Sequence, residues 1–180
     1  NKQIFLFLLA FLFYIDGVYT IIEMATVYGS ALGLDSAGLL IALLVTQIAA
    51  FPSSILIGRL SRDLSTRMLI SICICAYFFF AIFMSRQLHF WILALMVGMF
   101  QGGIQALSRG HFAKMIPPEK SGEYFGVMDI CGKGASFIGT TTISLVSQLT
   151  GNANLGIGAL ALFFAVGLIL FQLSFRKHSN

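Results

Sequence analysis

Apolar runs separated by short polar segments extend along the whole chain. Most runs hold roughly 17–25 residues, enough for a helix to cross about 30 Å of hydrocarbon at about 1.5 Å per residue. The strands of a membrane barrel would instead be segments of about ten residues with strict alternation. The pattern therefore predicts an all-α membrane protein in which residues 1–180 form a single bundle of six transmembrane helices. The expected spans are 4–28, 36–58, 68–84, 90 to the Pro117-Pro118 break, 124–149 and 155–175.

Polar side chains are distributed unequally among these six runs. The third run carries no charge, and the sixth has Gln172 as its one strongly polar side chain. Helices that are apolar all round face lipid or fill packing space. The costly polar residues are concentrated in the first run of each triplet. We therefore expect two inverted three-helix repeats, the pattern of an internally repeated transporter half.

The fourth run carries a polar stripe. Gln101, Gln105 and Arg109 are four residues apart, so they share one helix face. Polar groups at membrane depth are expensive and usually face a bundle interior or a water-filled path. The stripe is therefore a candidate transport route. The alternative for the glutamines is that they hold neighbouring helices together by hydrogen bonds.

Two other runs contain paired ionisable residues. Asp16 and Glu23 in the first run are two helical turns apart and share a face, as expected for a proton or cation relay or for partners of a cationic group. Glu23 lies near the outer end, where it either forms an outer gate or simply reaches the interface. Asp129 and Lys133 in the fifth run have the spacing of an in-helix ion pair. The threonines at 140–142 are expected to bond to backbone carbonyls rather than to substrate.

Composition confirms the class and narrows the partners. Of 180 residues, 58% are hydrophobic and 10% charged, whereas soluble domains have about 25% charged residues. The net charge of +4 comes from basic residues at the ends of runs, so we expect no nucleic-acid partner. Cys73, Cys75 and Cys131 all lie within apolar runs, which supports neither a disulfide framework nor a metal site. We expect no cofactor.

The basic residues also predict the orientation. With the amino terminus in the cytoplasm, alternate crossings place nine basic residues on the cytoplasmic side and Arg86 outside, as the positive-inside rule requires. Both termini are therefore expected in the cytoplasm. The nine are Lys2, Arg59, Arg62, Arg67, Arg109, Lys114, Lys120, Arg176 and Lys177.

Counting residues from each entry point gives the depth of the polar side chains. Four of them, from four runs, fall about 16–18 Å into the bilayer, near its middle, and two more form a layer nearer the cytoplasm. The midplane is where secondary transporters hold substrate and coupling ions. We therefore expect a substrate or ion site built from the first layer of Asp16, Gln47, Gln101 and Lys133 and the second layer of Gln105 and Asp129.

Three stretches of the sequence resemble a known family. The segments 13–18, 102–109 and 116–126 are similar to the vacuole effluxer branch of the major facilitator superfamily, and the likeness covers nearly the whole chain. That branch includes bacterial relatives and the vacuolar amino-acid exporters associated with autophagy. The resemblance implies the carboxy-terminal six-helix half of a transporter that works by alternating access. The first and fourth helices of each half would line its cavity.

The segment between the second and third runs resembles a loop motif of the same superfamily, Gly-x-Leu-x-Asp-Arg-x-Gly-Arg-Arg. We expect residues 58–67 to form a short basic connection. Gly58 and Leu60 match the motif, whereas Arg62 and Asp63 stand in reversed order. Charges here either mark the cytoplasmic side or form ion pairs across the end of the bundle. In the second case, Arg62 and Asp63 would close a cytoplasmic gate together with Arg109.

The sequence thus favours half of a secondary active transporter for a small polar solute, with amino acids as the leading class by analogy. The chain is expected to be a piece of a longer polypeptide, partnered in the bilayer by an amino-terminal six-helix half or a second copy. A competing hypothesis is a membrane scaffold or subunit that transports nothing. An enzyme is the least favoured class, because no catalytic or metal-ligand cluster converges at one depth.

Overall fold

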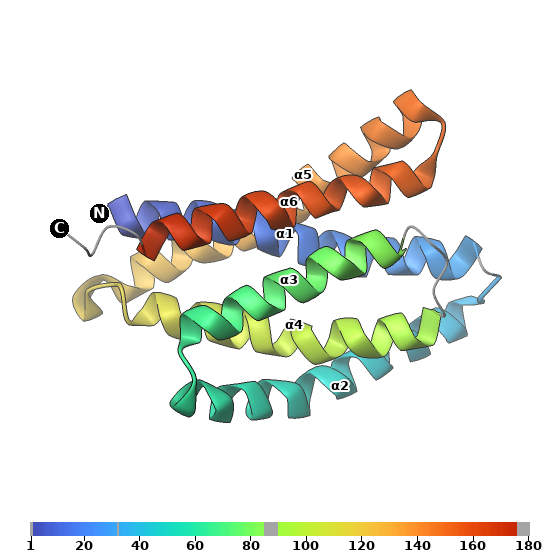
Figure 1. The fold of residues 1–180 in the computed structure, drawn as a ribbon. Helices are drawn as coiled ribbons and strands as arrows, with labels where there is room; N and C mark the ends of the chain where they lie inside the picture. The colour runs from blue at the N-terminus through green and yellow to red at the C-terminus, as the bar shows by residue number, and fades with distance from the viewer. Residues whose placement is uncertain (1, 32, 85–89, 176–180) are drawn as a thin grey trace.

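The protein folds as a bundle of long helices. The computed structural model describes residues 2–31, 33–84 and 90–175, and within them there is no strand. All six expected helices are present, and Figure 1 shows successive helices running in opposite directions. The all-α prediction is therefore confirmed. The elements are α1 (Lys2–Ala31), α2 (Ser36–Asp63), α3 (Thr66–Met84), α4 (Phe90–Ala113), the 3-10 turn η1 (Pro118–Lys120), α5 (Ser121–Thr150) and α6 (Ala153–Phe175).

The helix ends follow local chemistry. The Asp35 carboxylate accepts a hydrogen bond of 2.8 Å from the Gly38 backbone N–H and caps the start of α2. At the other end of the bundle, α5 stops at Gly151, whose φ of 66° is the left-handed conformation that glycine adopts without steric cost. The Pro117-Pro118 break lies between α4 and α5, as the sequence predicts.

One connection differs from the prediction. Residues 58–67 were expected to form a basic loop, but α2 continues to Asp63 and α3 begins at Thr66. The interior Pro52 does not end α2 either. Only Leu64 and Ser65 connect the two helices, because Arg59 and Arg62 are good helix formers and lie exposed on the last turns of α2. The prediction of a loop was wrong, since a polar composition at the end of a span does not by itself end a helix.

The length and apolar composition of the helices identify an integral membrane protein. Four of the described helices are long and apolar enough to cross a bilayer: Lys2–Val27 of α1, then α2, α4 and Leu155–Phe175 of α6. The apolar part of α3 is shorter, Thr66–Ile82, and α5 carries Asp129 and Lys133 along its length. The predicted orientation uses Arg86, Arg176 and Lys177, which lie outside the described residues.

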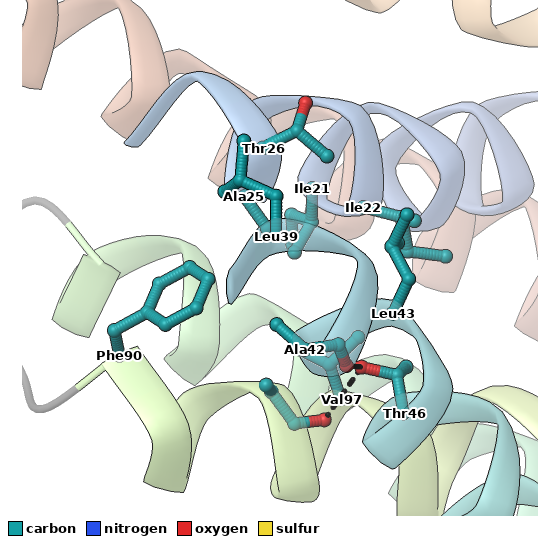
Figure 2. Close-up of a pocket in the computed structure, with 11 residues that line it drawn as sticks. Ile21, Ile22, Ala25, Thr26, Leu39, Ala42, Leu43, Thr46, Phe90 and Val97 are labelled. Atoms are coloured by element: carbon teal, nitrogen blue, oxygen red, sulfur yellow. Dashed lines mark hydrogen bonds between the residues drawn. The ribbon is translucent and has the colours of Figure 1, made fainter. Parts of the chain in front are cut away.

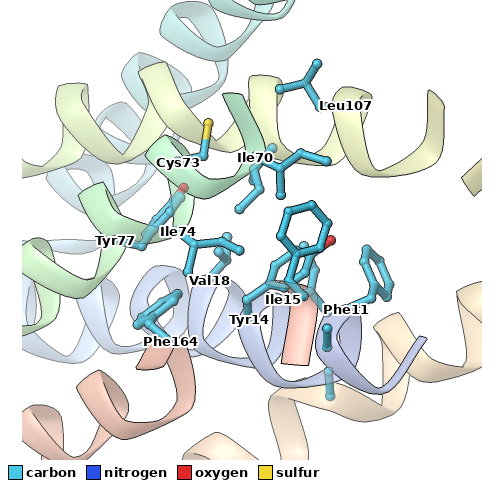
Figure 3. Packing of buried hydrophobic residues seen from close by; sticks show 14 of the residues in the cluster. Phe11, Tyr14, Ile15, Val18, Ile70, Cys73, Ile74, Tyr77, Leu107 and Phe164 are labelled. Carbon is cyan, nitrogen blue, oxygen red and sulfur yellow. The ribbon is translucent and has the colours of Figure 1, made fainter. Parts of the chain in front are cut away.

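Aromatic side chains fill the core around α1. The Tyr77 ring of α3 stacks on Phe164 of α6 with centroids 5.6 Å apart, and its hydroxyl donates to the Val97 carbonyl of α4 at 3.0 Å. The Tyr14 hydroxyl lies 2.7 Å from Ser108 Oγ. Figure 3 shows Tyr14 and its α1 neighbours facing α3 residues across this core. Both buried tyrosines therefore have hydrogen-bonded hydroxyls, as a low-dielectric interior requires.

The helices pack as close pairs. α2 packs extensively only against α4, α1 packs against both α5 and α6, and α3 packs against α6 and α4. Two glycines set the first contact: a Cβ on Gly98 or Gly102 would overlap the backbone carbonyl oxygen of Thr46 or Ala50. Small residues let membrane helices approach this closely. The opposite face of α2 is apolar and open, with Ile48 and Phe51 about 70% exposed.

Candidate functional site: a polar cavity between three helices

A polar cavity lies between α1, α4 and α5. Its volume is about 90 Å³, enough for several water molecules, because one occupies roughly 10–15 Å³ on this measure. Four of its residues belong to the polar set that the sequence predicts: Gln105 and Arg109 on α4, and Asp129 and Lys133 on α5. The complete lining is Phe11, Tyr19, Gln105, Arg109, Met128, Asp129, Gly132 and Lys133.

An ion pair bridges two walls of this polar cavity. Arg109 Nη2 lies 2.7 Å from Asp129 Oδ1, and the two side chains are 55% and 44% exposed. The expected pairing of Asp129 with Lys133 within α5 is therefore wrong, because Asp129 turns toward α4. Among the described residues, Lys133 has no ion-pair partner. The polar cavity thus contains a partly exposed ion pair and a second cation, Lys133, whose charge no acidic side chain of the described residues compensates.

Helical spacing explains how the sequence builds these walls. Gln105 and Arg109 are one turn apart on α4, as are Asp129 and Lys133 on α5, so each pair shares a face. Between the α5 charges, Gly132 has no side chain; a Cβ there would meet the ring of Phe11 at an ordinary 3.7 Å. The space beside the charges is therefore kept open by a missing side chain rather than by strain.

Asp16 lies outside the lining of the polar cavity, in the contact between α1 and α5. Its side chain is fully buried, and Oδ1 accepts a hydrogen bond of 3.0 Å from the Gly139 backbone N–H. Oδ2 and the buried hydroxyl of Thr20, one turn along α1, have no hydrogen-bond partner among the described residues. A Cβ on Gly139 would overlap Thr20 Oγ1. This contact is thus tight, with two buried oxygens that could each accept a hydrogen bond or a cation.

The other predicted site residues are spread over the bundle. Gln101 is buried on α4, one turn from Gln105, and its Oε1 has no partner among the described residues. Gln47 is exposed on α2, and Glu23 is exposed on α1. Arg62 and Asp63 are exposed at the end of α2. None of these five residues lines the polar cavity.

A second cavity, between α1, α2 and α4, is apolar. Figure 2 shows Ile21, Leu39, Phe90 and Val97 around it. Its most buried hydroxyl, that of Thr46, already donates to the carbonyls of Ala42 at 2.9 Å and Ala94 at 3.3 Å. This cavity therefore offers little to a polar solute. Within the described part of the chain, no three His, Cys, Asp or Glu side chains are grouped as a metal site.

Four lining residues of the polar cavity were not predicted: Phe11, Tyr19, Met128 and Gly132. Gly132 lies three residues after Asp129, and Met128 lies one turn before Gly132, so helical spacing could have identified both. Phe11 gives no such signal, because it looks like any apolar residue of a span. The threonines at 140–142 were predicted correctly: each donates to a backbone carbonyl three or four residues earlier.

Comparison with known proteins gives a consistent match. A family model described as "Vacuole effluxer Atg22 like" matches residues 1–179. The "Uncharacterized MFS-type transporter YxiO" of Bacillus subtilis is 45% identical over 172 residues, which are 94% of this chain and 40% of the relative. "Autophagy-related protein 22" of Cryptococcus neoformans is 30% identical over 93% of this chain and 32% of its own length. The chain therefore spans less than half the length of these relatives.

Proposed function

The chain belongs to the Atg22-like vacuole effluxer family, and on that premise we propose that it is part of a secondary transporter for a small polar solute. The observation that carries the proposal is the polar cavity, in which Gln105, Arg109, Asp129 and Lys133 converge on a space of about 90 Å³ inside an apolar bundle. Charged groups at membrane depth usually line a substrate or ion path. The relative from Bacillus subtilis is itself named as an MFS-type transporter.

Amino acids are the proposed substrate class. A zwitterion carries an ammonium and a carboxylate, and the cavity offers both complements: the Asp129 carboxylate, and the cations Arg109 and Lys133. Binding would replace part of the Arg109–Asp129 ion pair by charge-assisted hydrogen bonds to the solute. Gln105 would orient the bound molecule. Gln101, one turn away with an unpartnered carbonyl oxygen, would extend the path along the same helix face.

We also propose roles for the predicted residues that do not line the polar cavity. Asp16 is a candidate for holding a coupling proton or cation, because one of its buried oxygens has no partner in the described chain. Arg62 and Asp63 would belong to a cytoplasmic gate together with Arg109, and Glu23 to an outer gate. Gln47 lies on the open face of α2, so its contact with solute would need a neighbouring subunit or half.

We propose that the active transporter combines this chain with another six-helix half, or with a second copy of itself. The partial coverage of the relatives supports this arrangement, as does the exposed apolar face of α2. The helix pairings also support an internal repeat. In such a repeat α1, α2 and α3 would correspond to α4, α5 and α6. The contact of α2 with α4 then corresponds to the contact of α5 with α1, and both contacts are present. All six helices would then cross the bilayer, with both termini in the cytoplasm.

Counterflow of a panel of amino acids into proteoliposomes containing the full-length protein tests this function. Lys133→Gln and Asp129→Asn should lower the flux, whereas Lys120→Gln, at an exposed position of η1, should leave it unchanged. A scaffold that transports nothing would exchange no solute with any variant. Unchanged flux in both cavity variants would show that the solute does not bind in the polar cavity.

A further inference from the structure

A second polar cavity lies at one end of the bundle, where α1 and α3 begin and α4 and α6 end. These four helix ends are together on the side of Figure 1 that carries both chain termini. The volume of this end cavity is about 410 Å³, and it shares no residue with the polar cavity described above. Its lining consists of Gln3, Ile4, Arg67, His111, Lys114, Met115, Ser174 and Phe175.

The end cavity is basic. Arg67 and Lys114 line it together with His111, and none of the described lining residues is acidic. Neither Arg67 nor Lys114 forms an ion pair with an acidic side chain in the described ranges. The amino-terminal ends of α1 and α3 add a favourable dipole for an anion, and the carboxy-terminal ends of α4 and α6 oppose it. The basic side chains therefore decide the sign of the electrostatic potential in the end cavity, which is positive.

Arg67 is held in place by its neighbours rather than by an acid. Its Nε and Nη2 both donate to Gln172 Oε1, the former at 2.8 Å, and Gln172 Nε2 donates to Ser71 Oγ at 2.8 Å. The guanidinium lies 4.7 Å from the centre of the Phe175 ring. A guanidinium has more donors than Gln172 can use, so Arg67 is fixed in position while still able to bind an anion.

An apolar groove continues from the same arginine. Arg67 and Gln172 line it with Leu168, Ile169 and Leu173 of α6, and its volume is about 390 Å³. Ile169 is 60% exposed. Arg67 therefore stands between a basic cavity at the end of the bundle and an open apolar surface along a membrane helix. A phospholipid matches this arrangement, because its charged phosphate is joined to apolar acyl chains. A free phosphate would occupy only the end cavity.

We propose that the end cavity binds the phosphate of an anionic phospholipid whose acyl chain lies along α6. Arg67 provides paired N–H donors to the phosphate, and Lys114 and His111 complete its shell. Two uncompensated cations select a headgroup with net negative charge over a zwitterionic one, which carries its own cation. Basic pockets between membrane helices bind anionic headgroups for this reason. The site is independent of the solute cavity and of the proposed transport.

Native mass spectrometry of the full-length protein, purified with equimolar phosphatidylglycerol and phosphatidylcholine, tests the proposal. The native protein should retain phosphatidylglycerol preferentially. Arg67→Gln and Lys114→Gln should each weaken this retention roughly fivefold. Arg59→Gln and Lys120→Gln, exposed cations at the same end of the bundle, are the matched controls and should retain the lipid. Equal retention of both lipids, or equal losses in controls and cavity variants, would overturn the site.

Two further arms separate a lipid from a free anion. Ile169→Asn should reduce phosphatidylglycerol retention, whereas Ile130→Asn, an exposed isoleucine on α5, should not. Inorganic phosphate alone should raise the thermal unfolding midpoint less than phosphatidylglycerol does. An equal rise with phosphate, together with no effect of Ile169→Asn, would show a free-anion site and overturn the lipid assignment. If Arg67→Gln lowers the unfolding midpoint before lipid is added, its loss of lipid could come from a damaged fold. In that case, the retention of phosphatidylglycerol by Lys114→Gln decides the test.

Discussion

Arg109 Nη2 on α4 lies 2.7 Å from Asp129 Oδ1 on α5, and this ion pair is the one direct charge contact between α4 and α5 in the described chain. Both side chains are about half exposed and line the polar cavity, which has room for several water molecules, so solvent or solute can reach them. A pair of this kind holds the helices together weakly, because water competes for both charges. It is better suited to exchanging partners than to stabilising the fold.

Asp129→Asn is therefore expected to reduce transport far more than stability. The solute ammonium would lose a charge-assisted hydrogen bond, which lowers counterflow by roughly tenfold or more. The free energy of unfolding should change by less than about 1 kcal/mol, since the ion pair is exposed. Counterflow and thermal unfolding in detergent measure the two effects. Glu123→Gln, an exposed carboxylate on the same helix, is the control and should change neither.

Gly102→Ala should destabilise the contact between α2 and α4. The added Cβ would overlap the Ala50 carbonyl oxygen, and backbone cannot move aside as a side chain can. Overpacking of this kind costs about 1–3 kcal/mol. Gly110→Ala, on the same helix with nothing within 4 Å, should leave the unfolding midpoint equal or higher, because alanine is the better helix former. Equal midpoints for the two variants would contradict the close contact.

Gly139→Ala should lower stability in a way that depends on Thr20. The new methyl group would overlap Thr20 Oγ1 and approach its Cβ to 3.0 Å. Thr20→Ala removes a hydroxyl that has no described partner, so alone it should cost little. The double variant should recover part of the loss. A double-mutant cycle on the unfolding free energies measures this coupling, and strictly additive effects would show that the two residues do not meet.

Asp16→Asn tests the proposed coupling role separately from packing. Asparagine keeps an oxygen for the Gly139 N–H at nearly the same volume, so the fold should be maintained. If Asp16 binds the coupling ion, the variant should still exchange solute but fail to accumulate it against a gradient. Uptake driven by an imposed proton or sodium gradient provides the measurement. Asp35→Asn makes the same change at an exposed helix cap and should accumulate normally; unaltered accumulation in Asp16→Asn would assign the residue to structure alone.

The positions of the helices could be predicted closely from the sequence, because hydrophobic run length directly reflects a membrane span. The end of α2 could not. Arg62 and Asp63 were expected in a loop but extend the helix, since their backbone hydrogen bonds form equally well at the membrane surface. Local composition shows where a helix leaves an apolar environment, and the last residues of the helix are decided by propensity and capping.

The candidate site could be predicted only in part. Helical spacing correctly placed Gln105 and Arg109 on one face of α4, and Asp129 and Lys133 on one face of α5, because a shared face depends on one helix alone. It could not show that Asp129 turns to Arg109, since that depends on the rotation and distance of two helices. The same limit applies to Asp16: counting residues gives a depth along α1 but not the direction of the side chain, which contacts Gly139 outside the cavity.

The glycine contacts have a mechanical consequence. Gly98 and Gly102 join α4 to α2, and Gly139 joins α5 to α1, with backbones or buried groups in direct contact. We therefore expect each pair to move as one rigid unit, and the boundary between the two units runs through the polar cavity. The Arg109–Asp129 ion pair and the buried hydrogen bond between Tyr14 and Ser108 both cross that boundary. Sliding one unit past the other to widen the cavity would break these two polar contacts and leave the contacts of Gly98, Gly102 and Gly139 intact.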